Sequence, residues 1–401
     1  MPDLLARDDD PMFGLLRVMH DDGSASANDP GLDDATLLRM YREMRRLRLL
    51  DEKMLIVQRQ GRIGFYGEVK GQEAAPIAAG FALEPDDWIF QGLREGAAML
   101  VRGFPLATYV AQCWGNSLDV QKGRQMPSHY AGRAVNQVSW SSCIGPQVPQ
   151  AVGAAMAMRM KGSRSVALAF FGDGATSQPD VHNAMTFAAR YKAPVVLACQ
   201  NNHWAISVPS RAQTAAPTFA SRAVAYGMPG VRVDGNDILA VYVALRDAAA
   251  RARRGEGPTL LECVTYRMGA HSSSDDPSRY RSNEEVATWA KRDPVDRFRR
   301  YLAGRGLVTD ATDEALLAEL TAEISAAIAE AERHPNAPRE QIFDDVYRDL
   351  PWHLAEWAAR AAPDDASIAA VRASVYGNRV EAEGSLMAKG IFGDAARARP
   401  R

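Results

Sequence analysis

Two short apolar runs, joined by a glycine turn and a helical segment, constrain the fold of this chain most strongly. The first run, 166–171, leads directly into the turn at 172–174, and the second run, 195–199, precedes two asparagines. Between the runs, apolar residues recur at helical spacing over 181–188. A buried strand, a turn, a helix and a second buried strand predict a right-handed crossover within a parallel sheet.

The rest of the chain continues this alternation of strands and helices. Further strands are predicted at 231–233 and 259–266, with a helix between them at 238–254. Helical spacing also predicts helices at 34–60, 145–160, 295–302 and 313–333. Alternating elements of this kind predict an α/β fold, a parallel sheet flanked by helices.

Composition divides the chain into four segments. Residues 1–32 are rich in Asp, Pro, Gly and Ser and are expected to form a flexible N-terminal arm, although 12–16 are apolar enough to pack on a partner. The α/β domain is expected over 33–290. A C-terminal helical region over 291–358 and a C-terminal tail over 359–401 are expected to follow it.

Charge and cysteine content exclude several classes of protein. The 47 basic and 49 acidic residues nearly cancel, which gives no electrostatic footprint for nucleic acid or for an anionic membrane. None of the four cysteines forms a C-x-x-C pair, so we expect free thiols in a reducing cytoplasm. No apolar stretch approaches the roughly 20 residues of a membrane helix, and the N-terminus has no signal-peptide pattern. A soluble cytoplasmic protein is expected.

Polar residues that follow the predicted strands form the candidate functional site. Asp173 follows one strand, Asn202 the next, and Arg267 and His271 a third, and ligands bind at this edge of an open α/β sheet. Asp173 offers a carboxylate oxygen, while Asn202 and the backbone carbonyl of Trp204 offer neutral oxygens, a combination that suits Mg²⁺. One carboxylate is too little charge to hold Mg²⁺ alone, so the metal is expected to arrive with a diphosphate. Arg267 adds a fixed positive charge for the same phosphates.

The glycine turn adds backbone donors to this site. Gly172 and Gly174 let N–H groups approach an anion, with Ala175 and a helix N-terminus behind them. A lone Gly-Asp-Gly is usually an ordinary turn. The same turn after an apolar strand, with Asn-Asn closing the next strand, is far more specific and is typical of thiamine-diphosphate sites.

The chain resembles the alpha subunits of 2-oxo acid dehydrogenases, namely branched-chain 2-oxo acid dehydrogenase and its pyruvate and acetoin relatives. The strongest resemblance lies in FFGDGATSQPDVHNAMTFAARYKAPVVLACQNNHWAIS. It extends over about 40–355 through blocks such as QRQGRIGFYGEVKGQEA, KGRQMPSHY, SSCIGPQVPQAVGAA and YRMGAHSSSDDPSRYRS. The resemblance implies thiamine diphosphate and Mg²⁺ as cofactors.

The resemblance also assigns roles to individual residues. It implies Mg²⁺ ligands at Asp173, Asn202 and the carbonyl of Trp204. It implies contacts with the cofactor at Arg94, Ser142, Ile144, Gly172, Asp173, Gly174, Ala175, Asn202, Arg267 and His271. The potassium site of some relatives matches 141–147. His271, whose ring has a reference pKa of about 6.5, is the first candidate for acid or hydrogen-bonding work at the reacting carbon, and His129 is the second.

Four positions depart from the family pattern. Gly92 and Leu93 stand where relatives often have Gln and Tyr, and Gln200 stands where a phosphate-binding Arg can occur. Pro146 replaces a Thr whose side chain helps to hold K⁺. These changes bear on the affinity for diphosphate and on the potassium site, and they leave the expected Mg²⁺ ligands in place.

The implied activity is oxidative decarboxylation of a 2-oxo acid, with transfer of the acyl group to a lipoyl carrier on an acyltransferase component. A glutamate of the beta subunit completes the site in the family, so an α2β2 heterotetramer is implied. A branched-chain substrate is favoured, and a pyruvate or acetoin dehydrogenase subunit or a non-catalytic scaffold subunit are the alternatives. The serine-rich loop at 272–276 is expected to be ordered only with cofactor, and Ser272 matches a regulatory phosphorylation site of animal relatives.

Overall fold

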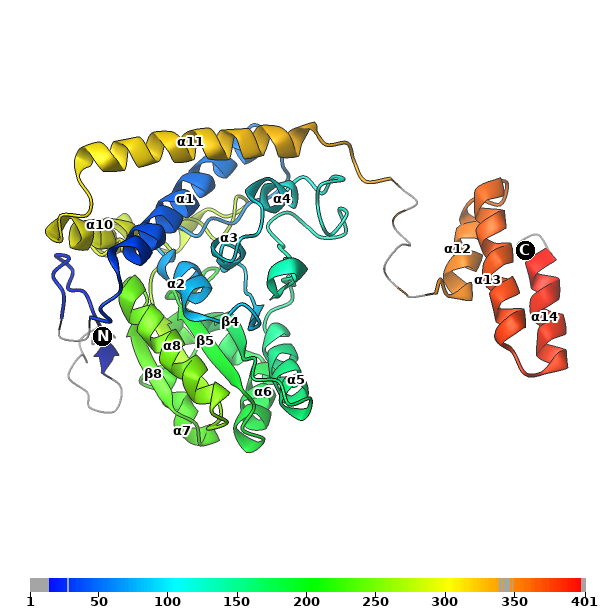
Figure 1. Ribbon diagram of the computed structural model, residues 1–401, viewed down its shortest axis with the longest axis horizontal. Helices are drawn as coiled ribbons and strands as arrows, with labels where there is room; N and C mark the ends of the chain where they lie inside the picture. Colours follow the sequence, from blue (N-terminus) through cyan, green and yellow to red (C-terminus); the bar gives the residue numbers. More distant parts are fainter. Residues whose placement is uncertain (1–13, 27–28, 339–340, 342–346, 348, 398–401) are drawn as a thin grey trace. The chain divides into compact units, whose positions relative to one another are not determined.

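The computed structural model describes residues 14–26, 29–338, 341, 347 and 349–397 (Figure 1). The chain divides into two compact units, Met1–Asn336 and Ala337–Arg401. The first unit contains the sheet and all the candidate site residues. None of the helices in the described part of the chain is long and apolar enough to cross a membrane.

A seven-stranded parallel sheet forms the centre of the first unit and confirms the predicted fold class. Its strands, in spatial order, are β1 (Leu15–Leu16), β8 (Gly230–Asp234), β9 (Thr259–Val264), β5 (Val195–Asn201), β4 (Ala167–Gly172), β2 (Trp88–Phe90) and β3 (Gln137–Val138). All six neighbouring pairs are parallel. A separate antiparallel ribbon pairs β6 (Trp204–Ala205) with β7 (Val208–Pro209).

Helices cover both faces of the sheet (Figure 1). The helices of one face are α1 (Asp34–Arg59), α2 (Ala74–Ala82) and α8 (Ile238–Arg253), and those of the other are α5 (Gln147–Met160) and α6 (Pro179–Arg190). Side chains along β4 alternate between the two cores, Leu168 and Phe170 toward one, Ala169 and Phe171 toward the other. An apolar residue at every position is therefore what a strand buried on both faces requires.

Shorter helices and turns connect these layers. They are α3 (Ala98–Val101), α4 (Leu106–Ala111), α7 (Ala223–Tyr226), α9 (Asn283–Ala290) and the 3₁₀ turns η1 (Arg133–Val135), η2 (Asp173–Ser177), η3 (Ser210–Ala212), η4 (Ala220–Arg222) and η5 (Pro277–Arg279). Two longer helices, α10 (Pro294–Gly304) and α11 (Asp310–Arg333), pack against α1. Because of that packing, the expected boundary at 290 does not separate two units.

The N-terminal segment differs from the expected flexible arm. Leu15 and Leu16 pair with β8 as an edge strand, and the side chains of Val18 and Met19 are completely buried. The N–H groups of Val18 and Met19 donate to Asp237 Oδ2 at 2.8 and 2.6 Å. The expectation of a flexible arm was therefore wrong for 14–26, because these apolar residues complete the core of this unit. Residues 1–13, which include Met12 and Phe13, lie outside the described part of the chain.

The described residues of the C-terminal unit form three α-helices, α12 (Trp352–Ala361), α13 (Ala366–Ala382) and α14 (Leu386–Arg397). Arg372 on α13 donates from Nε to Glu356 Oε2 on α12 at 2.6 Å, and from Nη1 to the carbonyl of Ala395 on α14 at 2.7 Å. The expected boundary at 358 was wrong, since it divides α12, and the described part of the expected tail, up to Arg397, is largely helical.

Candidate functional site

The carboxyl ends of β4, β5 and β9 bring the predicted site residues to one edge of the sheet. The register pairs Gly172 with Gln200 across β4 and β5, and Asn201 with Val264 across β5 and β9. Asp173 begins η2 directly after β4, Asn202 follows β5, and Arg267 follows β9 by three residues. The predicted strand–turn–helix–strand crossover is thus the element that places Asp173 and Asn202 at the same edge.

Asp173 is a buried carboxylate that no cation in the described part of the chain pairs with. Asp173 is only 1% exposed, and its Oδ2 accepts a hydrogen bond from Gln213 Nε2 at 2.6 Å. Burial raises the pKa of Asp173 to about 6, because the charged form has lost most of its hydration. A metal ion at this carboxylate would replace that lost hydration.

Gly174 allows the turn to approach the loop after β5. A Cβ atom at this position would lie 2.6 Å from Cβ of Ala205 in β6, closer than side chains pack, whereas a Cβ at Gly172 would meet nothing within 4 Å. Ala175 follows with its side chain in the core beneath α6. The close contact between η2 and β6 explains why this position of the turn is a glycine.

The side-chain amide of Asn202 has a fixed orientation. Its Nδ2 donates to Gln72 Oε1 at 2.9 Å, and its Oδ1 accepts from the backbone N–H of Trp204 at 3.2 Å. Gln72 is completely buried, so it can serve this amide without competition from water. Sequence analysis did not identify Gln72, although it lies in the KGQEA block that carries part of the resemblance.

Two buried guanidinium groups, those of Arg94 and Arg267, lie close enough for the charge of Arg267 to lower the pKa of Arg94. Arg94 is 5% exposed and donates to the carbonyls of Glu68 and His271, the latter at 2.9 Å. Arg267 is 1% exposed and donates to the carbonyls of Trp204 and Ile206 at 3.2 and 2.7 Å.

Neither arginine forms an ion pair with a carboxylate in the part of the chain that the structure describes. Arg267 also donates to the hydroxyl of Tyr280 at 2.7 Å, while its Nε is buried and without a hydrogen-bond partner among the described residues. Burial lowers the pKa of both guanidinium groups, that of Arg94 to about 10. Buried cations that meet only neutral partners are costly, and an anion between them would remove that cost.

His271 is held beside these two arginines. Burial, followed by the charges of Arg94 and Arg267, lowers the pKa of His271 to about 4. With this pKa the ring is neutral near pH 7. The backbone N–H of His271 donates to Asp275 Oδ2 at 2.7 Å, and Tyr280 donates to the same oxygen at 2.5 Å.

Several contacts within the protein hold the serine-rich loop, and the expectation that cofactor orders it stays a prediction. Arg281 donates to the carbonyls of Arg267, Met268 and Gly269, the last two at 2.6 Å. The N–H of Ser273 donates to the carbonyl of Tyr66 at 2.9 Å. Arg281 thereby anchors the start of the loop, and Ser273 anchors its middle. Ser272 is 8% exposed, so its hydroxyl is largely shielded from solvent in this conformation.

The loop before α5 carries Ser142 and Ile144, both exposed. Ser142 Oγ hydrogen-bonds to His129 Nε2, which brings the second histidine candidate to this loop. Gly145 has φ of +94°, and a Cβ there would lie 3.2 Å from Val181 on α6. The loop therefore packs against the helix that follows Asp173. Pro146 precedes α5 and supplies no hydroxyl for a potassium ion.

Two departures from the family pattern meet at one buried carboxylate, Glu95. The N–H of Gly92 donates to Glu95 Oε2 at 2.8 Å, and Gln200 Nε2 donates to Glu95 Oε1. Burial raises the pKa of Glu95. Gln200, which stands where an arginine can occur, thus donates to a buried carboxylate inside the protein.

The residues present fit Mg²⁺ held jointly with a diphosphate. Among the described residues there is no group of three or more His, Cys, Asp or Glu side chains that could hold a metal ion alone. Asp173 supplies one buried carboxylate, and the carbonyl of Trp204, although it accepts from Arg267, retains a second lone pair. The protein supplies one negative charge for the metal and two buried arginines nearby. Such a site suits a metal ion that is bound together with phosphate oxygens.

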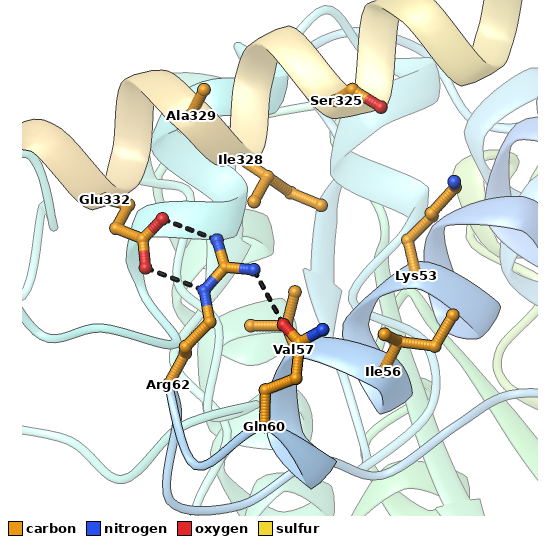
Figure 2. A pocket seen from close by; sticks show the side chains of 9 residues that line it. All are labelled: Lys53, Ile56, Val57, Gln60, Arg62, Ser325, Ile328, Ala329 and Glu332. Carbon is orange, nitrogen blue, oxygen red and sulfur yellow. Dashed lines mark hydrogen bonds and ion pairs between the residues drawn. The ribbon is translucent and has the colours of Figure 1, made fainter.

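A cavity of about 300 Å³ lies away from this edge, between α1 and α11 (Figure 2). Ile56, Val57 and Ile328 line it, and the ion pair between Arg62 and Glu332, with 2.5 Å from nitrogen to oxygen, closes one end. None of the sequence-predicted site residues contributes to it, and it adds nothing to the chemistry of the sheet edge.

The fold and the site define a parallel α/β protein with buried arginines and a buried carboxylate at the carboxyl edge of its sheet. The family model described as dehydrogenase E1 component matches residues 41–340. The chain belongs to this family, which depends on thiamine diphosphate. The predicted family and, at this level, the predicted function are therefore confirmed.

Relatives with assigned names lie at about 40% identity. The chain is 39% identical over 356 residues to "2-oxoisovalerate dehydrogenase subunit alpha, mitochondrial" of Caenorhabditis elegans, covering 88% of this chain and 82% of the relative. It is 40% identical over 347 residues to "Pyruvate dehydrogenase E1 component subunit alpha" of Staphylococcus aureus strain Mu50, covering 86% and 91%. Both names are those of alpha subunits.

Proposed function

We propose that this chain is the alpha subunit of the decarboxylating component of a 2-oxo acid dehydrogenase, acting on a branched-chain 2-oxo acid. The observation that carries the proposal is the pair of buried arginines, Arg94 and Arg267, which form no ion pair with a carboxylate in the described chain. The charge of Arg267 also acts on the buried Asp173. A diphosphate would compensate the charges of the two arginines, and the Mg²⁺ bound with it would compensate the charge of Asp173.

The proposed site divides into three groups of contacts. Asp173, Asn202 and the carbonyl of Trp204 would hold Mg²⁺. The diphosphate would be bound by Gly172, Gly174, Ala175, Arg94, Arg267 and His271, and the aminopyrimidine ring by Ser142 and Ile144. K⁺ at 141–147 belongs to the proposal only if a group other than the side chain of Pro146 completes the site.

Bound thiamine diphosphate supplies a ring that accepts the electron pair released when carbon dioxide leaves. The residues of this chain orient the reactants and control protons. The neutral ring of His271 has one N–H group, which can donate a hydrogen bond to a substrate oxygen. Its other nitrogen has a lone pair and can accept a proton. His129 acts farther away, through Ser142, and is not expected to touch the substrate.

The acyl group is proposed to pass to a lipoyl carrier on an acyltransferase component, whose disulfide is the electron acceptor. A beta subunit in an α2β2 heterotetramer would complete the active site. Ile144 and Ile206, 53% and 52% exposed beside the charged edge, support coverage by such a partner. The four free cysteines are compatible with a reducing compartment, and we retain the cytoplasm as the proposed location.

Pyruvate is the second candidate substrate, because relatives named for pyruvate and for 2-oxoisovalerate are equally similar to this chain. An acetoin-cleaving enzyme of the same type is a third possibility. A scaffold without activity is motivated by Gly92, Leu93 and Gln200, two of which serve Glu95 instead of a cofactor. A scaffold would have no use for the costly burial of Arg94, Arg267 and Asp173, which favours the enzyme.

The test is a panel of 2-oxo acids with the complex of this chain and its beta partner, thiamine diphosphate, Mg²⁺ and a lipoyl-domain acceptor. We expect acylation of the lipoyl group, with the highest kcat/KM for 2-oxoisovalerate and its branched homologues. A higher kcat/KM for pyruvate would replace the substrate assignment. Absence of decarboxylation with every acid, in a complex that binds cofactor, would support the scaffold.

A further inference from the structure

The cavity between α1 and α11 is lined by one face of each helix (Figure 2). The lining residues of the two helices are Lys53, Ile56, Val57 and Gln60 on α1 or at its end, and Ser325, Ile328, Ala329 and Glu332 on α11. Both sets follow the spacing i, i+3, i+4 and i+7, which places them on a single helix face. The cavity volume of about 300 Å³ lies at the lower end of the range for small-molecule sites.

Ion pairs on both sides of the cavity fix the separation of the two helices. On the N-terminal side, Arg46 of α1 pairs with Glu323 of α11 at 3.2 Å. On the C-terminal side, Arg62 pairs with Glu332 at 2.5 Å. The methyl group of Ala329 is too small to fill the space between these pairs. The cavity is therefore a consequence of one small residue between two fixed contacts.

The floor of the cavity is apolar. Val57 and Ile328 are 4% and 7% exposed, so they belong to the core beneath the two helices. Ile56 is 48% exposed, and its side chain forms part of the wall on α1 (Figure 2). A ligand with an apolar body would remove this surface from water, which favours binding.

One lining cation has no partner. The ammonium group of Lys53 forms no hydrogen bond or ion pair with any residue that the structure describes. Arg62, by contrast, donates from Nε to Glu332 at 2.7 Å and from Nη1 to Gln60 at 3.0 Å. The hydroxyl of Ser325 is also free of hydrogen bonds within the described chain. The cavity thus offers one positive charge and one hydroxyl beside an apolar floor.

We propose that this cavity binds a small monocarboxylate with an apolar chain of roughly six carbon atoms. The chain packs on Ile56, Val57 and Ile328, and the carboxylate pairs with Lys53 and accepts a hydrogen bond from Ser325. A single unpaired lysine matches a single negative charge. None of these residues belongs to the sheet edge, so the inference stands apart from the proposed function.

The test is a calorimetric titration of the full-length chain with hexanoate, 2-oxohexanoate and hexanamide, the last of which keeps the apolar chain and loses the charge. Ala329→Leu fills the cavity, and Ala326→Leu is its matched control, because Ala326 is exposed on the same helix and does not line the cavity. Lys53→Gln removes the charge, and Lys161→Gln, at the end of α5, controls for loss of a lysine elsewhere. Melting temperature is measured for each variant.

We expect saturable binding of hexanoate to the wild type and weaker binding of hexanamide. Ala329→Leu should abolish binding without lowering the melting temperature, whereas Ala326→Leu should bind as the wild type does. Lys53→Gln should weaken binding of hexanoate about fivefold, the upper end for a partly exposed ion pair, and leave hexanamide unchanged. Absence of saturable binding to the wild type, or equal effects of the two leucine variants, would overturn the proposal.

The two acids distinguish the possible sources of the ligand. Equal affinities would support a site for short carboxylic acids in general, whereas tighter binding of 2-oxohexanoate would support a site for 2-oxo acids. Either affinity must be lost in Ala329→Leu, since binding that survives this change does not occur in the cavity and contradicts the proposal.

Methyl NMR of the wild type serves if the leucine variants do not fold. With ¹³C-labelled isoleucine methyl groups, bound hexanoate should give intermolecular NOEs to Ile56 and Ile328, which are assigned by substitution with valine. NOEs only to isoleucines outside the cavity would contradict the proposal.

Discussion

At the residue scale, the candidate site is organised by charges that burial has left uncompensated. Arg94, Arg267 and Asp173 are each at most 5% exposed, and none has an oppositely charged partner within ion-pair distance in the described chain. Burial of each of these charges lowers the stability of the ligand-free protein. A bound metal ion and diphosphate would give all three charges a partner of opposite charge. Ligand binding should therefore increase the stability of the protein through the same side chains.

Asp173→Asn should stabilise the ligand-free chain while abolishing Mg²⁺-dependent binding. The folded-state pKa of about 6 exceeds the unfolded value of 3.8, so the stability that this group contributes is present below pH 3.8 and lost as pH rises through 6. A shift of about 2 pKa units corresponds to about 3 kcal/mol at pH 8, which asparagine avoids. We expect a gain of about 1–3 kcal/mol at pH 8, measured by urea denaturation, that shrinks toward pH 4. Destabilisation at pH 8 would contradict this account.

His271 should not titrate between pH 5 and pH 8 in the ligand-free protein. Its folded-state pKa of about 4 lies below the usual 6.5, so its contribution to stability is present above pH 6.5 and lost as pH falls through 4. A bound diphosphate offsets the two arginine charges and should raise this pKa. NMR of the ring protons measures both states, with Arg94→Gln as the variant that raises the pKa without ligand. A midpoint near 6.5 in the ligand-free wild type would refute the assigned electrostatics.

Several side chains of the site could be predicted from the sequence because their signal is local. Asp173, Gly174 and Asn202 each follow a recognisable strand, and the strand fixes their position. Gln72 and Gln213 could not be found this way, since they reach Asn202 and Asp173 across separations of 130 and 40 residues. Such contacts depend on tertiary packing, which no local pattern encodes.

At the scale of elements, the sheet interior was predictable and its edges were not. The strands β4 and β5 contain the continuous apolar runs 167–171 and 195–199, whereas β1, β2 and β3 have two or three residues each and show no periodicity. The prediction of a flexible N-terminal arm was wrong for the same reason, because two apolar residues, Leu15 and Leu16, are too few to indicate a strand. Their burial against β8 is a consequence of the finished sheet.

The loop after β9 depends on Arg281 more than on its serines. Arg281→Ala removes three hydrogen bonds to consecutive carbonyls and the stacking of its guanidinium over Tyr266, at 5.5 Å. We expect limited proteolysis within 269–281 to become at least several-fold faster and cofactor affinity to fall. Arg279→Ala is the matched control, since the Arg279 side chain is 84% exposed and forms an ion pair with Asp276, three residues earlier. Equal cleavage of the two variants would show that Arg281 does not anchor the loop.

At the scale of the whole molecule, the family match and the compact units end at nearly the same place. The match covers 41–340, and the first unit ends at Asn336. The three C-terminal helices therefore lie outside the part of the chain that carries the site. In the proposed function, Ile144 and Ile206, which are 53% and 52% exposed, would be covered by the beta subunit.

The most direct test of the central claim is a calorimetric titration of the complex between this chain and its beta partner with thiamine diphosphate and Mg²⁺, beside the same complex carrying Asp173→Ala. We predict saturable binding to the wild type that requires Mg²⁺ and disappears in the variant. No binding to the wild-type complex would contradict the account, because the buried charges at the sheet edge would then serve some other ligand.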